Sequence, residues 1–232
     1  MQATAKPIQR QGHTPTDHQV RSEKLDTSRI ILVGAGGVGS FIAQYLGLLV
    51  GVEAILIIDG DTFERKNTDR QGLAAGNIGE DKVDAVAKAL SHSPALILTD
   101  NQFIDEQNFP EIIKSFQPTL LISAVDNDKA RKAIWAHNKD LPILWGANEQ
   151  WTPQAGLSLP QKPWNPMEAF SPADAAGPGC NIQTVWANAT AASMAGMLLG
   201  MHASDHEKWD KLPIFLSKSE NEMMFQMFAN EL

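Results

Sequence analysis

The stretch that decides the fold runs from residue 29 to residue 59 and reads RIILVGAGGVGSFIAQYLGLLVGVEAILIID. It begins with a β-branched apolar run at residues 30–33, passes through a glycine-rich turn, and continues with apolar residues at helical spacing between residues 38 and 49. A second apolar run at residues 54–58 leads directly into Asp59. This order predicts a strand, a helix and a second strand parallel to the first.

Short apolar runs continue to alternate with amphipathic segments further along the chain. The runs lie at residues 96–98, 120–122 and 142–145, and the helical segments at 83–90, 112–116 and 130–137. Because the apolar runs are continuous, they predict strands that are buried on both faces. We therefore expect an α/β fold, a Rossmann-like, doubly wound and mostly parallel sheet with helices on both sides.

The pattern changes after residue 145. Six prolines between residues 153 and 180 disfavour a helix and favour a hairpin followed by a crossing loop at about 160–180. The next uncharged segment contains Asn, Gln, Thr and Ser among its alanines, so it predicts a buried helix near 183–201 rather than a membrane span. Two apolar runs near the end, at 214–216 and 223–228, predict a terminal strand pair that extends the sheet.

Composition narrows the class of protein. The chain has 232 residues, 43% of them hydrophobic, which is enough for one substantial core. We expect a polar arm at 1–28 and a single domain at 29–232. One cysteine excludes an internal disulfide and a cysteine-based zinc site, and the net charge of −8 argues against a nucleic acid partner. The N-terminus shows no apolar run typical of a secretory signal, so we expect a soluble, cytoplasmic protein.

The glycine-rich turn predicts a nucleotide site. It supplies Gly34, Gly36, Gly37 and Gly39 between the first strand and the first helix, where backbone N–H groups can approach a phosphate. Asp59 follows Gly39 by 20 residues, the position from which a carboxylate accepts hydrogen bonds from ribose hydroxyls. The turn and its acid leave ATP and a dinucleotide equally open.

A second set of polar residues bears on that choice. Its members follow the second strand, begin the next helix or follow the strand at 120–122: Asp61, Asn67, Arg70, Lys82, Asp126 and Asn127. A nicotinamide dehydrogenase has no need of these groups, whereas a site that moves charge on phosphates needs cations and a carboxylate that holds Mg²⁺. Asp61 is equally compatible with a turn cap.

In order and spacing these motifs resemble the ThiF/MoeB/HesA superfamily, the bacterial relatives of ubiquitin-activating enzymes. The shared pattern is a GxGGxG loop, DxD followed by NxxRQ, a lysine about a dozen residues on, and an Asp-Asn pair. It covers residues 29–146 well and 147–232 loosely. The resemblance implies that a carboxylate attacks the α-phosphate of ATP. That carboxylate is usually the C-terminus of a small ubiquitin-like or sulfur-carrier protein ending in Gly-Gly.

The resemblance also implies roles for individual residues. The loop around Gly37 approaches the phosphates, Asp59 holds the ribose, and Asp126 binds Mg²⁺ with Asn127 beside it. Three residues would stabilise the negative charge that shifts in the transition state: Asn67, Arg70 and Lys82. In homodimers of this superfamily an arm arginine reaches the other subunit's site, which here would be Arg10, with Arg21 a lesser candidate. Cys180 resembles a cysteine that joins some members to their carrier, but a small buried thiol is its simpler interpretation.

Other interpretations stay open at this point. The sequence of residues 67–71, NTDRQ, also fits enzymes similar to tRNA threonylcarbamoyladenosine dehydratases, although such enzymes should show a basic face. A non-catalytic subunit that docks a carrier protein and a nicotinamide dehydrogenase are further alternatives. His202 and His206 could form a metal pair, but a polar helix end explains them as well. The apolar tail at 223–228 fits core or edge-strand packing better than a partner groove.

Overall fold

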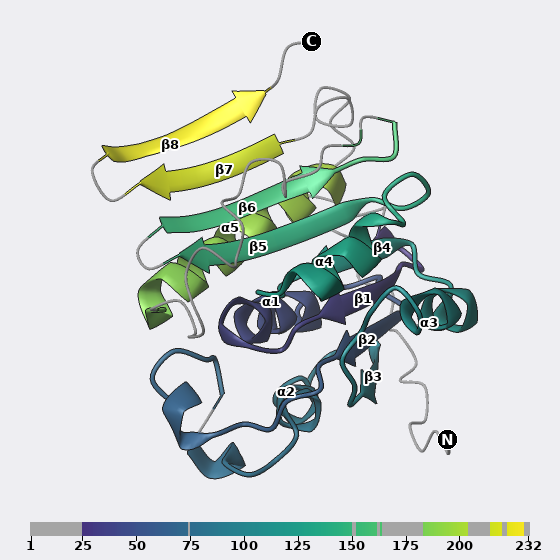
Figure 1. Ribbon diagram of the computed structural model, residues 1–232, viewed down its shortest axis with the longest axis vertical. Coiled ribbons are helices and arrows are strands. Elements are labelled where there is room, and N and C mark those ends of the chain that lie inside the picture. The colour runs from purple at the N-terminus through teal and green to yellow at the C-terminus, as the bar shows by residue number, and fades with distance from the viewer. Residues whose placement is uncertain are drawn as a thin grey trace.

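A sheet of eight strands runs through the molecule (Figure 1). The computed structural model describes residues 25–73, 75–149, 152–161, 163, 183–203, 214–219 and 222–229. Strand order is β3-β2-β1-β4-β5-β6-β7-β8, with the first five strands parallel and the last three antiparallel. The strands are β1 Arg29–Val33, β2 Ala54–Ile58, β3 Leu96–Asp100, β4 Leu120–Ser123, β5 Ile143–Glu149, β6 Thr152–Ser158, β7 Ile214–Ser219 and β8 Glu222–Ala229. The predicted α/β class is confirmed.

Helices cover both faces of the parallel part, as the continuous apolar runs predict. They are α1 Gly37–Gly47, α2 Lys82–Ala89, α3 Phe109–Phe116, α4 Asp128–Trp135 and α5 Val185–Ala203, with short 3₁₀ turns η2 Arg65–Asn67 and η3 Ala75–Asn77. Alternate residues of one strand enter two separate cores. In β1, Ile30 and Leu32 pack with residues of α1, α2 and α5, whereas Ile31 and Val33 pack with residues of α3 and α4.

Strand β3 departs from the expectation of burial on both faces. It lies at the edge of the sheet, and Leu96 in it is 41% exposed. A short apolar run predicts a strand but does not indicate whether that strand lies inside the sheet or at its edge. An edge position therefore explains why β3 is the least buried of the parallel strands.

The uncharged segment near 183–201 forms α5, which packs against α1, β5 and β6. Its buried side includes Ala191, Ala195 and Leu198, so the prediction of a core helix is confirmed. Among the described residues no helix has both the length and the apolar character that crossing a membrane requires. The hairpin expected after residue 145 is the antiparallel β5–β6 pair. The crossing loop at about 160–180 lies almost wholly outside the described residues.

Sheet topology creates a crevice between β1 and β4. Both strands pair in parallel with each other, with Val33 opposite Ser123, although β2 and β3 come between them in the chain. The connections therefore leave β1 and β4 in opposite directions along the sheet. Ligands of open α/β sheets bind at such a switch point, at the carboxyl ends of the strands.

Candidate active site

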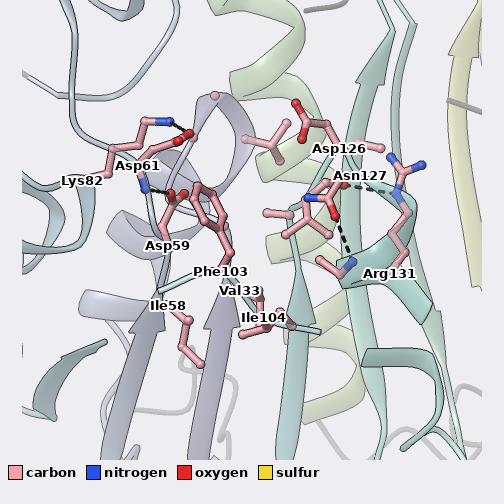
Figure 2. A pocket seen from close by; sticks show the side chains of 18 of the residues that line it. Val33, Ile58, Asp59, Asp61, Lys82, Phe103, Ile104, Asp126, Asn127 and Arg131 are labelled. Atoms are coloured by element: carbon pink, nitrogen blue, oxygen red, sulfur yellow. Dashed lines mark hydrogen bonds and ion pairs between the residues drawn. The ribbon is translucent and has the colours of Figure 1, made fainter. Parts of the chain in front are cut away.

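A cavity of about 350 Å³ lies at this switch point. Its lining comes from the loops that follow β1, β2, β3 and β4, from the starts of α1, α2 and α4, from β5 and from the segment before α5. Figure 2 shows Asp59, Asp61 and Lys82 on one side and Asp126, Asn127 and Arg131 on the other. We call the first three residues the β2 wall and the last three the β4 wall.

The glycine turn closes the bottom of the cavity. Gly34 has φ of +93°, and a Cβ atom there would lie 2.5 Å from the Ala124 carbonyl oxygen, so the turn requires glycine. Gly36 and Gly37 also line the cavity, where the first turn of α1 presents N–H groups that lack helical partners. Gly39 does not line it. A side chain at Gly39 would overlap the Gly34 carbonyl, so its place is in the packing of the turn.

Asp59 is tied to the glycine turn by its carboxylate. One oxygen accepts a hydrogen bond from the Ala35 N–H at 2.7 Å, and the other accepts one from the Asp61 N–H at 2.9 Å. Burial raises the pKa of Asp59 above its usual range, while the Lys82 charge and these two N–H groups act in the opposite direction. The side chain is therefore held at the edge of the cavity in one orientation.

Lys82 begins α2, as predicted, and its side chain is only 8% exposed. Its Nζ lies 2.6 Å from the Asp61 carboxylate. Asp61 is 53% exposed and lines the cavity together with Lys82. The β2 wall thus brings together three of the residues that the sequence assigned to the site.

The β4 wall contains the Asp-Asn pair and one residue that the sequence analysis missed. Asn127 accepts a hydrogen bond from the Ala130 N–H at 2.8 Å and so caps α4, which fixes the start of that helix beside Asp126. Arg131, one turn later, lines the cavity, donates to the Val125 carbonyl and lies 3.6 Å from Asp128. Burial lowers the pKa of Arg131, while Asp128 and Asp126 act to raise it.

A cation at the fifth position after Asp126 was a usable signal for this residue. Side chains on a helix tilt toward its N-terminus, so a long side chain one turn after the start of a helix can reach back to the carboxyl edge of the sheet where that helix begins. Arg131 lies outside the Asp-Asn pair from which this wall was predicted, and it was therefore overlooked.

Phe103 is the second missed residue, in the loop after β3. It lines the cavity with its ring against Gly60, where a Cβ atom would lie 2.7 Å from the ring, yet it is 66% exposed. Asn108 fixes the loop, because its amide donates to the Phe103 carbonyl at 2.9 Å and accepts from the Asp105 N–H. The exposed Phe103 ring forms an apolar platform near Asp59 (Figure 2).

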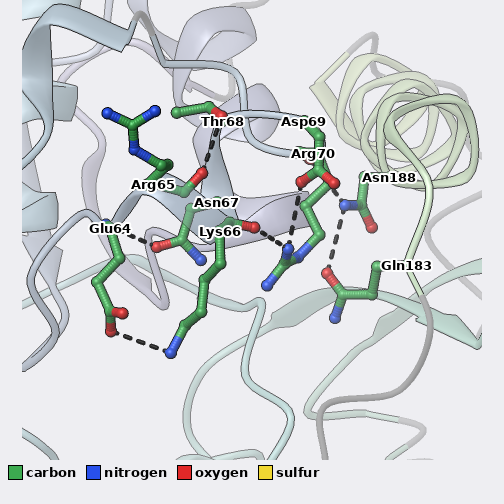
Figure 3. A network of polar contacts seen from close by, with 9 residues as sticks. All are labelled: Glu64, Arg65, Lys66, Asn67, Thr68, Asp69, Arg70, Gln183 and Asn188. Atoms are coloured by element: carbon green, nitrogen blue, oxygen red, sulfur yellow. Dashed lines mark hydrogen bonds and ion pairs between the residues drawn. The ribbon is translucent and has the colours of Figure 1, made fainter.

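Asn67 and Arg70 lie in a different place from the other predicted site residues, in the segment that we call the 64–71 turn. Neither lines the cavity. Asn67 is buried and accepts a hydrogen bond from the Glu64 N–H at 2.8 Å, which caps η2. Arg70 donates to the Lys66 carbonyl and contacts Asp69 at 3.3 Å (Figure 3). Both side chains serve the turn itself in this structure.

The 64–71 turn is nevertheless connected to the glycine turn. Asn188 of α5 donates to the Arg70 carbonyl at 2.9 Å and to the Gln183 side chain at 3.4 Å (Figure 3). A Cβ atom on Gly37 would meet the side chains of both Asn188 and Gln183, and Gln183 lines the cavity. The backbone of Arg70 is therefore linked through Asn188 to the glycine turn.

The structure locates only some of the residues that the sequence predicts for binding, catalysis or metal coordination. Arg10, Arg21, Cys180 and His206 lie outside the described residues. Within the residues that the structure does describe, no group of three or more His, Cys, Asp or Glu could hold a metal ion. Asp126 still suits Mg²⁺, which takes one or two protein carboxylates and completes its shell with phosphate oxygens and water. The donor set fits a metal that arrives with a nucleotide.

Comparison with known proteins identifies relatives of this chain. A sequence profile described as the ThiF family matches residues 8–206. An adenylyltransferase and sulfurtransferase uba4 from Aspergillus clavatus is 34% identical over 127 residues, which are 53% of this chain and 24% of that protein. A molybdopterin-synthase adenylyltransferase from Haemophilus influenzae is 32% identical over 130 residues, 54% of this chain and 52% of that protein.

Solved structures give the same picture of the fold. A crystal structure of Escherichia coli MccB with MccA-N7isoASN has a TM-score of 0.76 at 14% identity, and the match covers 90% of this chain and 66% of that one. The chain spans between about a quarter and a half of the length of the two curated relatives described above. The likeness to MccB shows the fold alone.

Proposed function

Because this chain belongs to the ThiF family, we propose that it is an ATP-dependent adenylyltransferase that activates a carboxylate as an acyl-adenylate. The observation that carries the proposal is the meeting of the β2 wall, the β4 wall and the glycine turn around one cavity at the switch point. The relatives named as adenylyltransferases support ATP as the nucleotide. A nicotinamide dehydrogenase would not require the Lys82 and Arg131 cations or the Asp126 carboxylate in this cavity.

ATP has a natural orientation in this cavity. Its phosphates lie over Gly34, Gly36 and Gly37, where the start of α1 offers N–H groups and a partial positive charge. Asp59 accepts hydrogen bonds from the ribose hydroxyls. The ring of Phe103, beside Asp59, gives the base an apolar surface against which to stack. Each part of the nucleotide thus meets the chemistry that it requires.

The reaction moves negative charge, and this chain's residues stabilise it. A carboxylate oxygen of the acceptor bonds to the α-phosphorus, the bond from that phosphorus to the bridging oxygen breaks, and pyrophosphate leaves with the electron pair. Lys82 neutralises charge on the phosphates, and Asp126, with Asn127 beside it, would hold Mg²⁺, which would supply Lewis-acid stabilisation there. Arg70 and Asn67 join them when the 64–71 turn exchanges its internal bonds for bonds to the phosphates.

We propose that the acceptor is the C-terminus of a small ubiquitin-like or sulfur-carrier protein. The names of the relatives support this class, because they act in sulfur transfer and on molybdopterin synthase. The net charge of −8 fits a protein acceptor better than tRNA, since a tRNA-binding protein should gather basic residues. Cys180 remains a proposed site of covalent transfer to that acceptor.

Assembly completes the proposal. Exposed apolar side chains on the neighbouring helices α1 and α5 and at the end of α1 suit a homodimer interface, namely Tyr45, Leu48, Trp186 and Met197. Such a dimer would let Arg10, in the 1–28 arm, enter the partner subunit's cavity, with residues 29–232 forming the adenylation domain. One cysteine in the whole chain is in keeping with a reducing compartment such as the cytoplasm.

ATP–pyrophosphate exchange tests the proposed function. The assay is run with Mg²⁺ and with candidate carrier proteins, with tRNA, or with no acceptor. We expect exchange that depends on a carrier with an intact C-terminal carboxylate and disappears when that carboxylate is amidated. Exchange driven by tRNA would assign the alternative substrate, and ATP binding without exchange under any condition would indicate a docking subunit. Copurified NAD would contradict the proposal outright.

A further inference from the structure

Asp61 is bound to Lys82 at two points. The Lys82 ammonium lies 2.6 Å from the Asp61 carboxylate, and the Lys82 backbone N–H donates to the Asp61 carbonyl at 2.9 Å. One residue therefore fixes both the start of α2 and the far end of the lysine that begins it. The sequence left the role of Asp61 open between a nucleotide ligand and a turn cap.

The pair is part of a continuous chain of bonds. The Asp61 N–H donates to one carboxylate oxygen of Asp59, and the other oxygen accepts from the Ala35 N–H of the glycine turn. The chain runs from the phosphate-facing turn, through the proposed ribose acid, to the lysine ammonium. A change in where Asp61 lies is thereby passed to Lys82 directly, without any shift of the glycine turn.

The Lys82 and Asp61 side chains differ in solvent exposure, and this difference indicates which of the two depends on the ion pair. Lys82 is 8% exposed, whereas Asp61 is 53% exposed. A buried ammonium needs a charged partner, while an exposed carboxylate is solvated without one. An ammonium carries three N–H donors, so the bond to Asp61 leaves two for other acceptors and sets the direction in which they point.

We propose that Asp61 is a positioning residue that aims the Lys82 ammonium into the cavity and makes no bond to the nucleotide itself. The catalytic part of this inference rests on the proposed function. Asp61 acts on the reaction only through Lys82, so its effect depends entirely on the presence of that lysine. The alternative is that Asp61 takes part directly, as a ligand of the ribose or of Mg²⁺.

A double-mutant cycle separates these roles. Asp61→Asn keeps the side-chain shape, and Asp84→Asn removes an exposed carboxylate from the first turn of the same helix as the matched control. We expect D61N to lower kcat by about 10- to 100-fold, because small displacements of a catalytic group cost that much. The KM for ATP should change far less. In the K82A background D61N should cost nothing further, and D84N should leave kcat unchanged.

Lysine ammonium signals in ¹⁵N-edited NMR spectra give a measurement that does not depend on turnover. An ammonium held by a short ion pair gives a resolved signal, which the K82A variant assigns. We expect that signal to vanish in D61N and to persist in D84N. Its persistence in D61N would overturn the positioning role, whatever the enzyme does.

The remaining outcomes also decide. A D61N cost that is equally large with and without Lys82 would show direct participation, and an increase in kcat would show that Asp61 restrains the lysine. Either result overturns the inference. Absence of exchange in the wild-type protein would defeat the proposed function, and the NMR comparison would then still decide whether Asp61 positions Lys82.

Discussion

The β2 wall and the 64–71 turn are neighbours in the chain, yet their side chains have different partners. In the β2 wall, Asp59 accepts from the glycine turn and Lys82 faces the cavity while bound to Asp61. In the 64–71 turn, Asn67 caps its own 3₁₀ helix and Arg70 donates to a carbonyl four residues earlier. Polar residues that follow a strand or begin a helix lie at the cavity because the sheet fixes the position of their backbone. Polar residues within a turn hydrogen-bond to the backbone of that turn instead.

Lys82→Ala should give the largest effect. We expect a loss of kcat of about 10²- to 10³-fold, because one preorganised charge is removed from the developing charge on the phosphates. Pyrophosphate exchange measures it. Lys88→Ala is the matched control, since Lys88 lies on the same helix, is 63% exposed and pairs with Glu80 away from the cavity. Equal losses of kcat in the two variants would show that Lys82 in the β2 wall has no special role in the reaction.

Phe103→Ala should give the next largest effect. Loss of the platform should weaken ATP binding by about 5- to 100-fold, the range that stacking of one base on an aromatic ring supports. Titration calorimetry with ATP measures it, and Phe103→Tyr should retain most of the affinity because the ring remains. If alanine binds ATP as tightly as phenylalanine does, the base lies elsewhere in the cavity.

Asn67→Ala sharpens the comparison from the side of the turn. Loss of the cap should lower the free energy of unfolding by about 0.5–2 kcal/mol, the usual cost of a helix cap. Urea denaturation measures it. Thr68→Ala is the control, since that hydroxyl donates to the Arg65 carbonyl at an exposed position. Unchanged stability would contradict the capping role of Asn67, and unchanged exchange would contradict its proposed role at the phosphates.

Asp59→Asn should give the smallest effect, a difference in stability from wild type that changes with pH. The pKa of Asp59 is raised in the folded state, so its stabilising contribution is present below the ordinary value of 3.8 and is lost as pH rises through the folded pKa. The difference in Tm between the variant and wild type should therefore move in the variant's favour as the pH rises from below 3.8 toward neutral. Thermal unfolding across that range measures it. A gain that is independent of pH would contradict the raised pKa.

Residues near strand ends were predictable from the sequence, and the reason is physical. Continuous apolar runs specify buried parallel strands, and the residues that follow such strands must gather at one edge. This reasoning placed Asp59, Asp61 and Asp126 at the cavity, and the lysine that begins α2 with them. Gly34 was placed for the same reason, and its positive φ explains why the turn needs glycine.

The remaining features depend on contacts that local patterns do not encode. The directions of Asn67 and Arg70 follow from the path of the 64–71 turn and from Asn188, which is more than a hundred residues away. Phe103 reaches the cavity because Asn108 holds its loop and Gly60 leaves room for its ring. Neither condition is visible in the sequence around residue 103.

The pairing of β1 with β4 has a consequence for the order of folding. Ile30 lies opposite Leu120, so one side of the first strand has no neighbour until residue 120 has been synthesised. During synthesis the glycine turn and Asp59 exist well before the crevice that makes them a site. Pairings this distant in sequence are slow to form, which leaves the apolar edge of β1 exposed for that interval. A nascent chain that stops before residue 120 would therefore be a target for chaperones, because the apolar edge of β1 would be exposed. Such a chain would carry the nucleotide motif without the crevice in which a nucleotide binds.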